Sequence, residues 1–161
     1  MKRYQITLYK QYPNVGLYSI QEQGASLCET DQFFKRFKDD ETYSRDIQII
    51  KRWVEQIGER GAKERYFKPE GRAKAIPLPP PKSDLRLYCY RISDNILILG
   101  NGGIKTSKKV KDSPDAFPHF KIMNDVAFVF ELKRSKGEIK VDGTSLSGDL
   151  SFFIKEPTDR K

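Results

Sequence analysis

The chain has 161 residues, of which 37% are hydrophobic and 12% aromatic, and this is enough for one domain with its own core. No apolar stretch approaches the roughly 18 residues of a membrane helix, and Met1–Arg3 lead into an alternating segment, so we expect no membrane span, no signal peptide and a cytoplasmic protein. The net charge is +8, and residues 60–110 contain twelve Lys or Arg against four acidic residues. A surplus confined to one segment favours a surface that faces a polyanion, the alternative being a basic surface without a ligand.

The N-terminal part of the chain predicts two strands followed by two helices. Arg3–Lys10 alternates apolar and polar side chains, which is typical of a strand, and Leu17–Gln21 is a candidate return strand. Thr30 or Asp31 can cap a short helix, and a longer helix then runs to about Gly58. Each helix carries an apolar stripe, formed by Phe33, Phe34 and Phe37 in the first and by Ile49, Ile50, Trp53, Val54 and Ile57 in the second. We expect both helices to pack on one face of a sheet.

Residues 59–82 form a basic connector. We expect a turn at Tyr66–Gly71 and a stiff, extended crossover at Ala73–Lys82, which contains four prolines.

The stretch Leu85–Lys109 predicts a buried β-hairpin. Its first strand, Leu85–Ile92, alternates, and Ser93–Asn95 supplies turn residues. The return strand, Ile96–Leu99, is apolar on both faces, as in an interior strand covered on each side, and Gly100–Gly103 is expected to end it. The first strand has two different faces, with Leu85, Leu87 and Cys89 expected to face the helix of Trp53 and Arg86, Tyr88 and Tyr90 on the other side.

The C-terminal part predicts a helix and two short strands. Asp112 or Ser113, followed by Pro114, is a good helix start, and Pro118 offers a second start one turn later. Phe120, Met123, Ala127 and Phe130 share a helical stripe that Gly137 would end, although Val126–Phe130 also fits a strand. Glu138–Val141 and Leu150–Ile154 are expected to be strands about a turn with Gly143 and Gly148, before a frayed tail at Glu156–Lys161. The whole chain, 1–161, is expected to form a single α+β domain.

Several kinds of site are not indicated. Gly103–Thr106 lacks the glycine that a phosphate-binding loop requires, and the two cysteines, Cys28 and Cys89, have no metal-ligand spacing. His119 is the only histidine, and we expect it to lie exposed near the third helix with no metal co-ligands. We therefore expect no metal and no cofactor.

Cationic and phenolic groups near the hairpin remain. RNA can be cleaved without metal when its 2′-hydroxyl attacks the adjacent phosphorus, provided that cations stabilise the phosphorane and a group protonates the leaving oxygen. Arg86, Tyr88 and Tyr90 could serve such chemistry, or they could simply cover a sheet face.

Three segments, in this order, resemble the RelE/ParE-type toxin superfamily, and most closely its phage-derived, HigB-like branch. The resemblance covers about residues 30–125 and is carried by Glu64–Gly71, Leu85–Arg91 and Ile96–Lys105. It implies a RelE-like α+β domain in which an antiparallel sheet packs against two helices. Relative to that core, the chain has extra N-terminal strands and a C-terminal extension, about 126–161.

The resemblance also implies a function. It suggests the toxin of a type II toxin–antitoxin system, a metal-independent endoribonuclease that cleaves mRNA at the ribosome and is neutralised by a cognate antitoxin protein. The alternative is a non-catalytic binding protein of the same fold, of the gyrase-inhibitor type or a regulatory partner. Arg86 matches the arginine that begins the central hairpin, and Lys105 or Lys108 matches the basic residue after the last strand. The expected RNA-binding residues are Arg65, Lys68, Tyr88, Tyr90, Arg91 and Lys109. The chain continues past the usual end of the family, and His119 is its sole candidate for the family's terminal acid.

Overall fold

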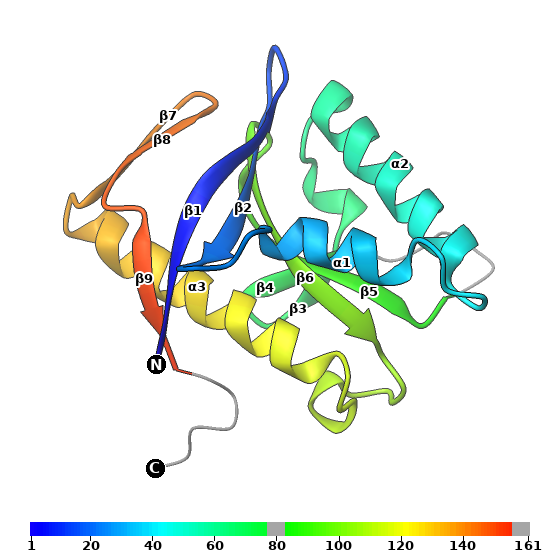
Figure 1. Cartoon of the computed structure of the whole chain (residues 1–161). Coiled ribbons are helices and arrows are strands. Elements are labelled where there is room, and N and C mark those ends of the chain that lie inside the picture. The colour runs from blue at the N-terminus through cyan, green and yellow to red at the C-terminus, as the bar shows by residue number, and fades with distance from the viewer. Residues whose placement is uncertain (77–82, 156–161) are drawn as a thin grey trace.

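The computed structural model describes residues 1–76 and 83–155. Its elements in chain order are β1 (Lys2–Gln11), β2 (Gly16–Glu22), α1 (Glu29–Phe37), α2 (Ser44–Arg60), the 3₁₀ turn η1 (Glu64–Tyr66), β3 (Lys68–Glu70), β4 (Ala73–Ile76), β5 (Leu85–Ser93), β6 (Ile96–Ile104), the 3₁₀ turn η2 (Val110–Asp112), α3 (Phe117–Ser135), β7 (Ile139–Asp142), β8 (Ser145–Gly148) and β9 (Ser151–Ile154) (Figure 1). The predicted α+β class is confirmed.

A seven-stranded sheet forms the centre of the molecule, in the order β3-β4-β5-β6-β2-β1-β9. All neighbours pair antiparallel except β2 and β6, which pair parallel. The prediction of a purely antiparallel sheet is therefore wrong at this one pair. Parallel neighbours require a long crossover, and here α1, α2 and the β3–β5 segment supply it.

Helices cover both faces of the sheet. Helices α1 and α2 lie on one face, over β2, β6 and β5, and α3 crosses the other face (Figure 1). Leu85, Leu87 and Cys89 pack in the cluster beneath α1 and α2, against which Trp53 is half-buried, so their predicted orientation is confirmed. The return strand is covered on each side, as expected, since Ile98 packs toward α3 and Leu97 toward α1 and α2.

The run Gly100–Gly103 belongs to β6, so the prediction that it ends the strand in a turn is wrong. These glycines allow close packing instead of a turn. A Cβ atom on Gly100 would lie 2.5 Å from the Met123 Cγ of α3, and one on Gly102 would lie 1.8 Å from the Arg86 carbonyl oxygen of β5. The absence of side chains here lets α3 and β5 approach β6.

The connector, residues 59–82, contains more regular secondary structure than expected. The segment predicted to turn, Tyr66–Gly71, contains the end of η1 and strand β3, and its turn lies at Gly71, whose φ is +61°. The extended stretch begins as β4, while residues 77–82 lie outside the described residues, as does the tail 156–161.

The C-terminal part completes the sheet. Helix α3 begins at Phe117, so Pro118 rather than Pro114 marks its start, and Val126–Phe130 is helical. Both predicted C-terminal strands form, as β7 and β9, but the segment between them is more than a turn, because it contains β8, which pairs with β7, while β9 pairs with β1. The extra N-terminal and C-terminal strands thus adjoin each other in the central sheet, and a boundary near residue 125 would fall inside α3. No helix of the described residues is long and apolar enough to cross a membrane.

Candidate functional site

The three residues predicted to be catalytic do not form a solvent-facing cluster. The Arg86 guanidinium is half-buried, and its Nη1 donates to the carbonyl oxygens of Ser83 and Leu85, the latter at 3.0 Å. Lys105 is only 8% exposed, so it does not face solvent as a residue of an RNA-binding surface would. Lys108 alone among the three is exposed. Two of the three predicted catalytic cations are therefore partly or largely buried, and Arg86 is held by contacts with the backbone.

Helix α3 covers Tyr88 and Tyr90, the two tyrosines expected to bind RNA. Tyr88 is fully buried and its ring lies edge-on to Phe120, at 5.8 Å between centroids, so it cannot stack on RNA in this fold. Tyr90 packs against Phe130, and its hydroxyl donates to the Glu131 carboxylate. Burial and this carboxylate raise the Tyr90 pKa, so the phenol stays protonated. The side chains of β5 alternate between two faces as predicted, but the second face packs against α3 instead of facing solvent.

Of the other residues predicted to contact RNA, one is held by contacts within the protein and four are exposed. Arg91 is held by its Nε, which donates to the Ala62 carbonyl at 2.6 Å, and by an ion pair with Asp94. Arg65, Lys68, Lys108 and Lys109 are exposed. These four side chains are available to a polyanion.

A different group of polar residues lines a pocket of about 330 Å³ at the end of the sheet. Helix α1 contributes Glu29 and Gln32, β6 contributes Asn101, and the start of α3 contributes His119. Lys2 of β1 and Lys155, which follows β9, add two cations, and Lys2 forms an ion pair with Glu22 at 3.4 Å. We call this the acid–base pocket, because it contains the single histidine and a buried glutamate; its other lining residues are Tyr4, Glu22, Pro118, Ile122 and Ile154.

Glu29 is an unusual carboxylate for the start of a helix. The first turn favours a negative charge, yet Glu29 is only 7% exposed. Its Oε1 accepts a hydrogen bond from Asn101 Nδ2 at 3.3 Å, and its Oε2 accepts one from Gln32 Nε2 at 3.1 Å. Burial raises the pKa of this carboxyl, and the negative charge of Glu22 adds to the increase, whereas the Asn101 hydrogen bond and Lys2 oppose it.

His119 lies in the first turns of α3, half-buried, which corrects the expectation that it is exposed. Its Nδ1 is buried and has no hydrogen-bond partner within the described part of the chain. Burial lowers the His119 pKa; Asp115 opposes this shift and Arg36 reinforces it. The neutral imidazole is therefore favoured near pH 7. A buried polar atom without a partner is uncommon and accompanies many functional sites.

The pocket thus holds a carboxyl group whose pKa is raised and an imidazole whose pKa is lowered, together with two lysines. Such a set can move protons to and from a bound phosphodiester or a similar anion. Among the described residues, no group of three or more His, Cys, Asp or Glu could hold a metal ion.

Sequence reasoning missed this site for a physical reason. Glu29 has the ordinary appearance of an acidic residue in a first helical turn, and nothing local distinguishes it. His119 was noticed only because it is the single histidine. The pocket brings together five residues that are far apart in the sequence, and only the tertiary structure places them side by side: Lys2, Glu29, Asn101, His119 and Lys155.

No protein-family model, no curated protein and no solved structure matches this chain.

Proposed function

We propose that the protein is a metal-independent endoribonuclease, whose acid and base are Glu29 and His119 in the acid–base pocket. The observation that carries this proposal is that one pocket contains the single histidine, a buried glutamate and two lysines. These are the groups that attack by the RNA 2′-hydroxyl requires: a base, an acid and positive charge. The chain's surplus of eight positive charges further supports a polyanionic substrate.

The reaction is an intramolecular transesterification. One residue removes the proton from the 2′-hydroxyl, and the 2′-oxygen forms a bond to the adjacent phosphorus. The bond from phosphorus to the 5′-oxygen then breaks, and the second residue gives that oxygen a proton. The products are a 2′,3′-cyclic phosphate and a 5′-hydroxyl, and no oxidant, reductant or added nucleophile is consumed.

The pKa shifts favour one assignment of roles. A histidine with a lowered pKa is neutral and can accept the 2′-hydroxyl proton, while a glutamate with a raised pKa is more often protonated and can donate to the leaving oxygen. Lys155 lines the same pocket, and its charge favours a phosphate there, whereas Lys2 forms an ion pair with Glu22 of the same lining.

The biological setting of the proposal is the toxin of a toxin–antitoxin pair, with an antitoxin protein as partner and mRNA at the ribosome as the target. This part is supported by the sequence resemblance described above. A small open reading frame adjacent to the gene, whose product rescues growth when the two are expressed together, is the expected genetic test.

The direct test of the proposal is cleavage of RNA by purified protein. A dinucleotide substrate needs to occupy only the acid–base pocket, so cleavage of it measures the chemistry apart from the binding of a longer chain. We expect products with 2′,3′-cyclic phosphate ends, and a loss of about 10²- to 10⁴-fold in rate for His119→Asn. Salt-sensitive RNA binding with no cleavage, in wild type and variant alike, would instead establish the non-catalytic alternative.

A further inference from the structure

At the edge of the sheet formed by β1 and β9, one face carries polar and aromatic side chains that no helix covers. The side chains of β1 alternate, so Tyr4 and Ile6 pack toward α3 while Arg3 and Gln5 lie exposed on the opposite face. Helices α1 and α2 cover β2, β6 and β5 on that face, and β1 and β9 lie beside them (Figure 1). Phe153 of β9 is 66% exposed, the most exposed aromatic side chain of the described residues.

Strand register places these residues in two rows. Arg3 pairs directly with Phe153 of β9, and on its other side its carbonyl accepts the Gln23 N–H at 2.8 Å. Gln5 pairs with Ser151 of β9 and with Gln21 of β2. Directly paired residues project from the same face of a sheet, and successive rows lie about 7 Å apart. We call this surface the sheet platform, and its members are Arg3, Gln5, Gln21, Gln23 and Phe153.

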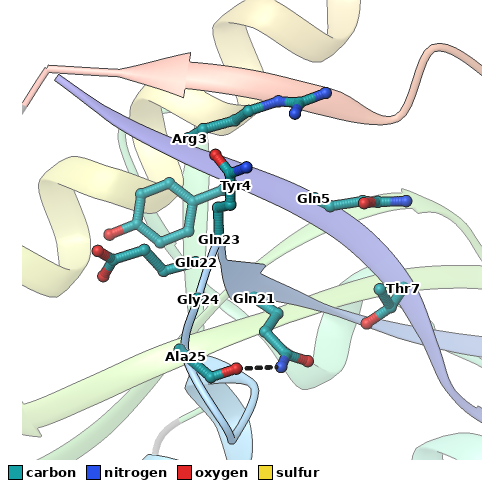
Figure 2. A pocket seen from close by; sticks show the side chains of 9 residues that line it. All are labelled: Arg3, Tyr4, Gln5, Thr7, Gln21, Glu22, Gln23, Gly24 and Ala25. Atoms are coloured by element: carbon teal, nitrogen blue, oxygen red, sulfur yellow. Dashed lines mark hydrogen bonds between the residues drawn. The ribbon is translucent and has the colours of Figure 1, made fainter.

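The platform side chains retain much of their binding capacity. The Arg3 guanidinium lies 5.9 Å from the centre of the Phe153 ring, and within residues 1–76 and 83–155 it forms no ion pair. In the same part of the chain the side-chain amides of Gln5 and Gln23 make no hydrogen bond, whereas Gln21 donates to the Ala25 carbonyl at 2.8 Å (Figure 2). An exposed ring, an arginine and free amides can stack on a base, bind a phosphate and bond to base edges, respectively.

The platform adjoins the acid–base pocket. A hollow of about 250 Å³ is lined by Arg3, Gln5 and Gln21, and it shares Tyr4 and Glu22 with the acid–base pocket. Figure 2 shows the side chains of Tyr4 and Glu22 directed to one side of β1 and those of Arg3 and Gln5 directed to the other. A strand lying on the platform can therefore pass around the end of the sheet into the pocket.

We propose that the sheet platform binds single-stranded RNA, with one base stacked on Phe153 and a phosphate bound by Arg3, and leads the strand into the acid–base pocket. The inference rests on the proposed function and names its substrate class. RNA fits better than a peptide because the platform has one apolar side chain among an arginine and three amides. Single strands are required because paired bases are already stacked and cannot lie on the ring.

The test uses the full chain carrying His119→Asn, so that bound RNA is not cleaved. Affinity for a short single-stranded RNA of mixed sequence is compared with that for its duplex, with and without Phe153→Ala. We expect the single strand to bind more tightly, and Phe153→Ala to weaken its binding by about 5- to 150-fold. Arg3→Ala should lower the salt dependence of binding by about one released counterion.

The chain offers a matched control on another surface. Phe128 of α3 is 51% exposed, and the Arg72 guanidinium lies 5.0 Å from its ring centre, so it repeats the arginine–aromatic pair of the platform. Phe128→Ala and Arg72→Ala should leave single-strand affinity within about twofold of the parent, because a surface substitution without a bound base has little effect.

The outcomes separate the two proposals. Equal affinities of the parent and Phe153→Ala proteins for the single strand would overturn the platform, while dinucleotide cleavage by the wild-type chain would still support the proposed function. Loss of single-strand affinity in Phe153→Ala, with dinucleotide cleavage retained when His119 is present, would support both.

Discussion

Glu29→Gln is the substitution that best separates a functional carboxylate from a structural one. Glutamine has nearly the same shape but neither ionises nor gives up a proton at any relevant pH. Its single oxygen can still accept from Asn101 Nδ2, but its amide nitrogen then faces Gln32 Nε2, which donates to Glu29 Oε2 in the wild-type protein. If Glu29 takes part in proton transfer, the rate of RNA cleavage should fall by about 10²- to 10⁴-fold, which corresponds to about 3–5 kcal/mol of transition-state stabilisation.

The same substitution has two opposing effects on stability at neutral pH, because it removes the acceptor of Gln32 Nε2 but also removes the cost of burying a charge. The Glu29 carboxylate gains two hydrogen bonds from amides, which lower its pKa, but burial raises the pKa and is the larger effect. A group whose pKa is raised on folding favours the folded state when it is protonated, so the contribution of Glu29 to stability should be greatest below the carboxyl's ordinary pKa of 4.5 and should be lost as the pH rises through the folded-state value. Glutamine carries no such penalty, and Glu29→Gln should show a flatter dependence of stability on pH.

The assay measures cleavage and urea unfolding on the same preparations at several pH values. Glu138→Gln is the control, since Glu138 is exposed after the end of α3 and should affect neither quantity by more than a small factor. Reduced stability of Glu29→Gln at pH 7 with unchanged cleavage would show that the carboxylate holds α1 to β6 and has no part in catalysis, and would refute the reasoning.

Four further outcomes follow from the structure. Cleavage should be fastest between the ordinary pKa values of the two groups, 4.5 for Glu29 and 6.5 for His119. Either assignment of acid and base gives this same bell-shaped dependence of rate on pH. A rate that rises steadily to pH 9 would exclude the pair. Cleavage should survive a chelator, and its abolition by chelation would contradict the mechanism. Gly102→Ala should lower the free energy of unfolding by at least about 1–3 kcal/mol in urea titrations, because the added Cβ meets a backbone oxygen at 1.8 Å, whereas a mild effect would favour the turn that the sequence predicted. Arg86→Ala should lower stability by about 1–3 kcal/mol, because Ser83 and Leu85 lose their side-chain donor, and dinucleotide cleavage should persist when measured well below the unfolding temperature; selective loss of cleavage would restore Arg86 to the site.

The sequence determined the elements of this protein because their signals are local. Period-two alternation identified the strands that became β1 and β5, and the stripes around Phe33 and Trp53 identified the two helices on one face. The continuous apolar run Ile96–Leu99 correctly predicted a strand covered on both sides. Local pattern failed at Gly100–Gly103, because a glycine that makes room for a neighbouring element has the same local sequence as one that makes a turn.

Only the tertiary structure decided which side chains reach solvent and which residues meet. Helix α3 packs over the face of β5 that carries Tyr88 and so buries a tyrosine that alternation alone placed on an open surface. The parallel pairing of β2 with β6 and the pairing of β9 with β1 bring Lys2 and Lys155 to the pocket beside Glu29 at the start of α1. Glu29 and His119, ninety residues apart, share a pocket for that reason, since long-range pairing of strands leaves no trace in the residues around either one.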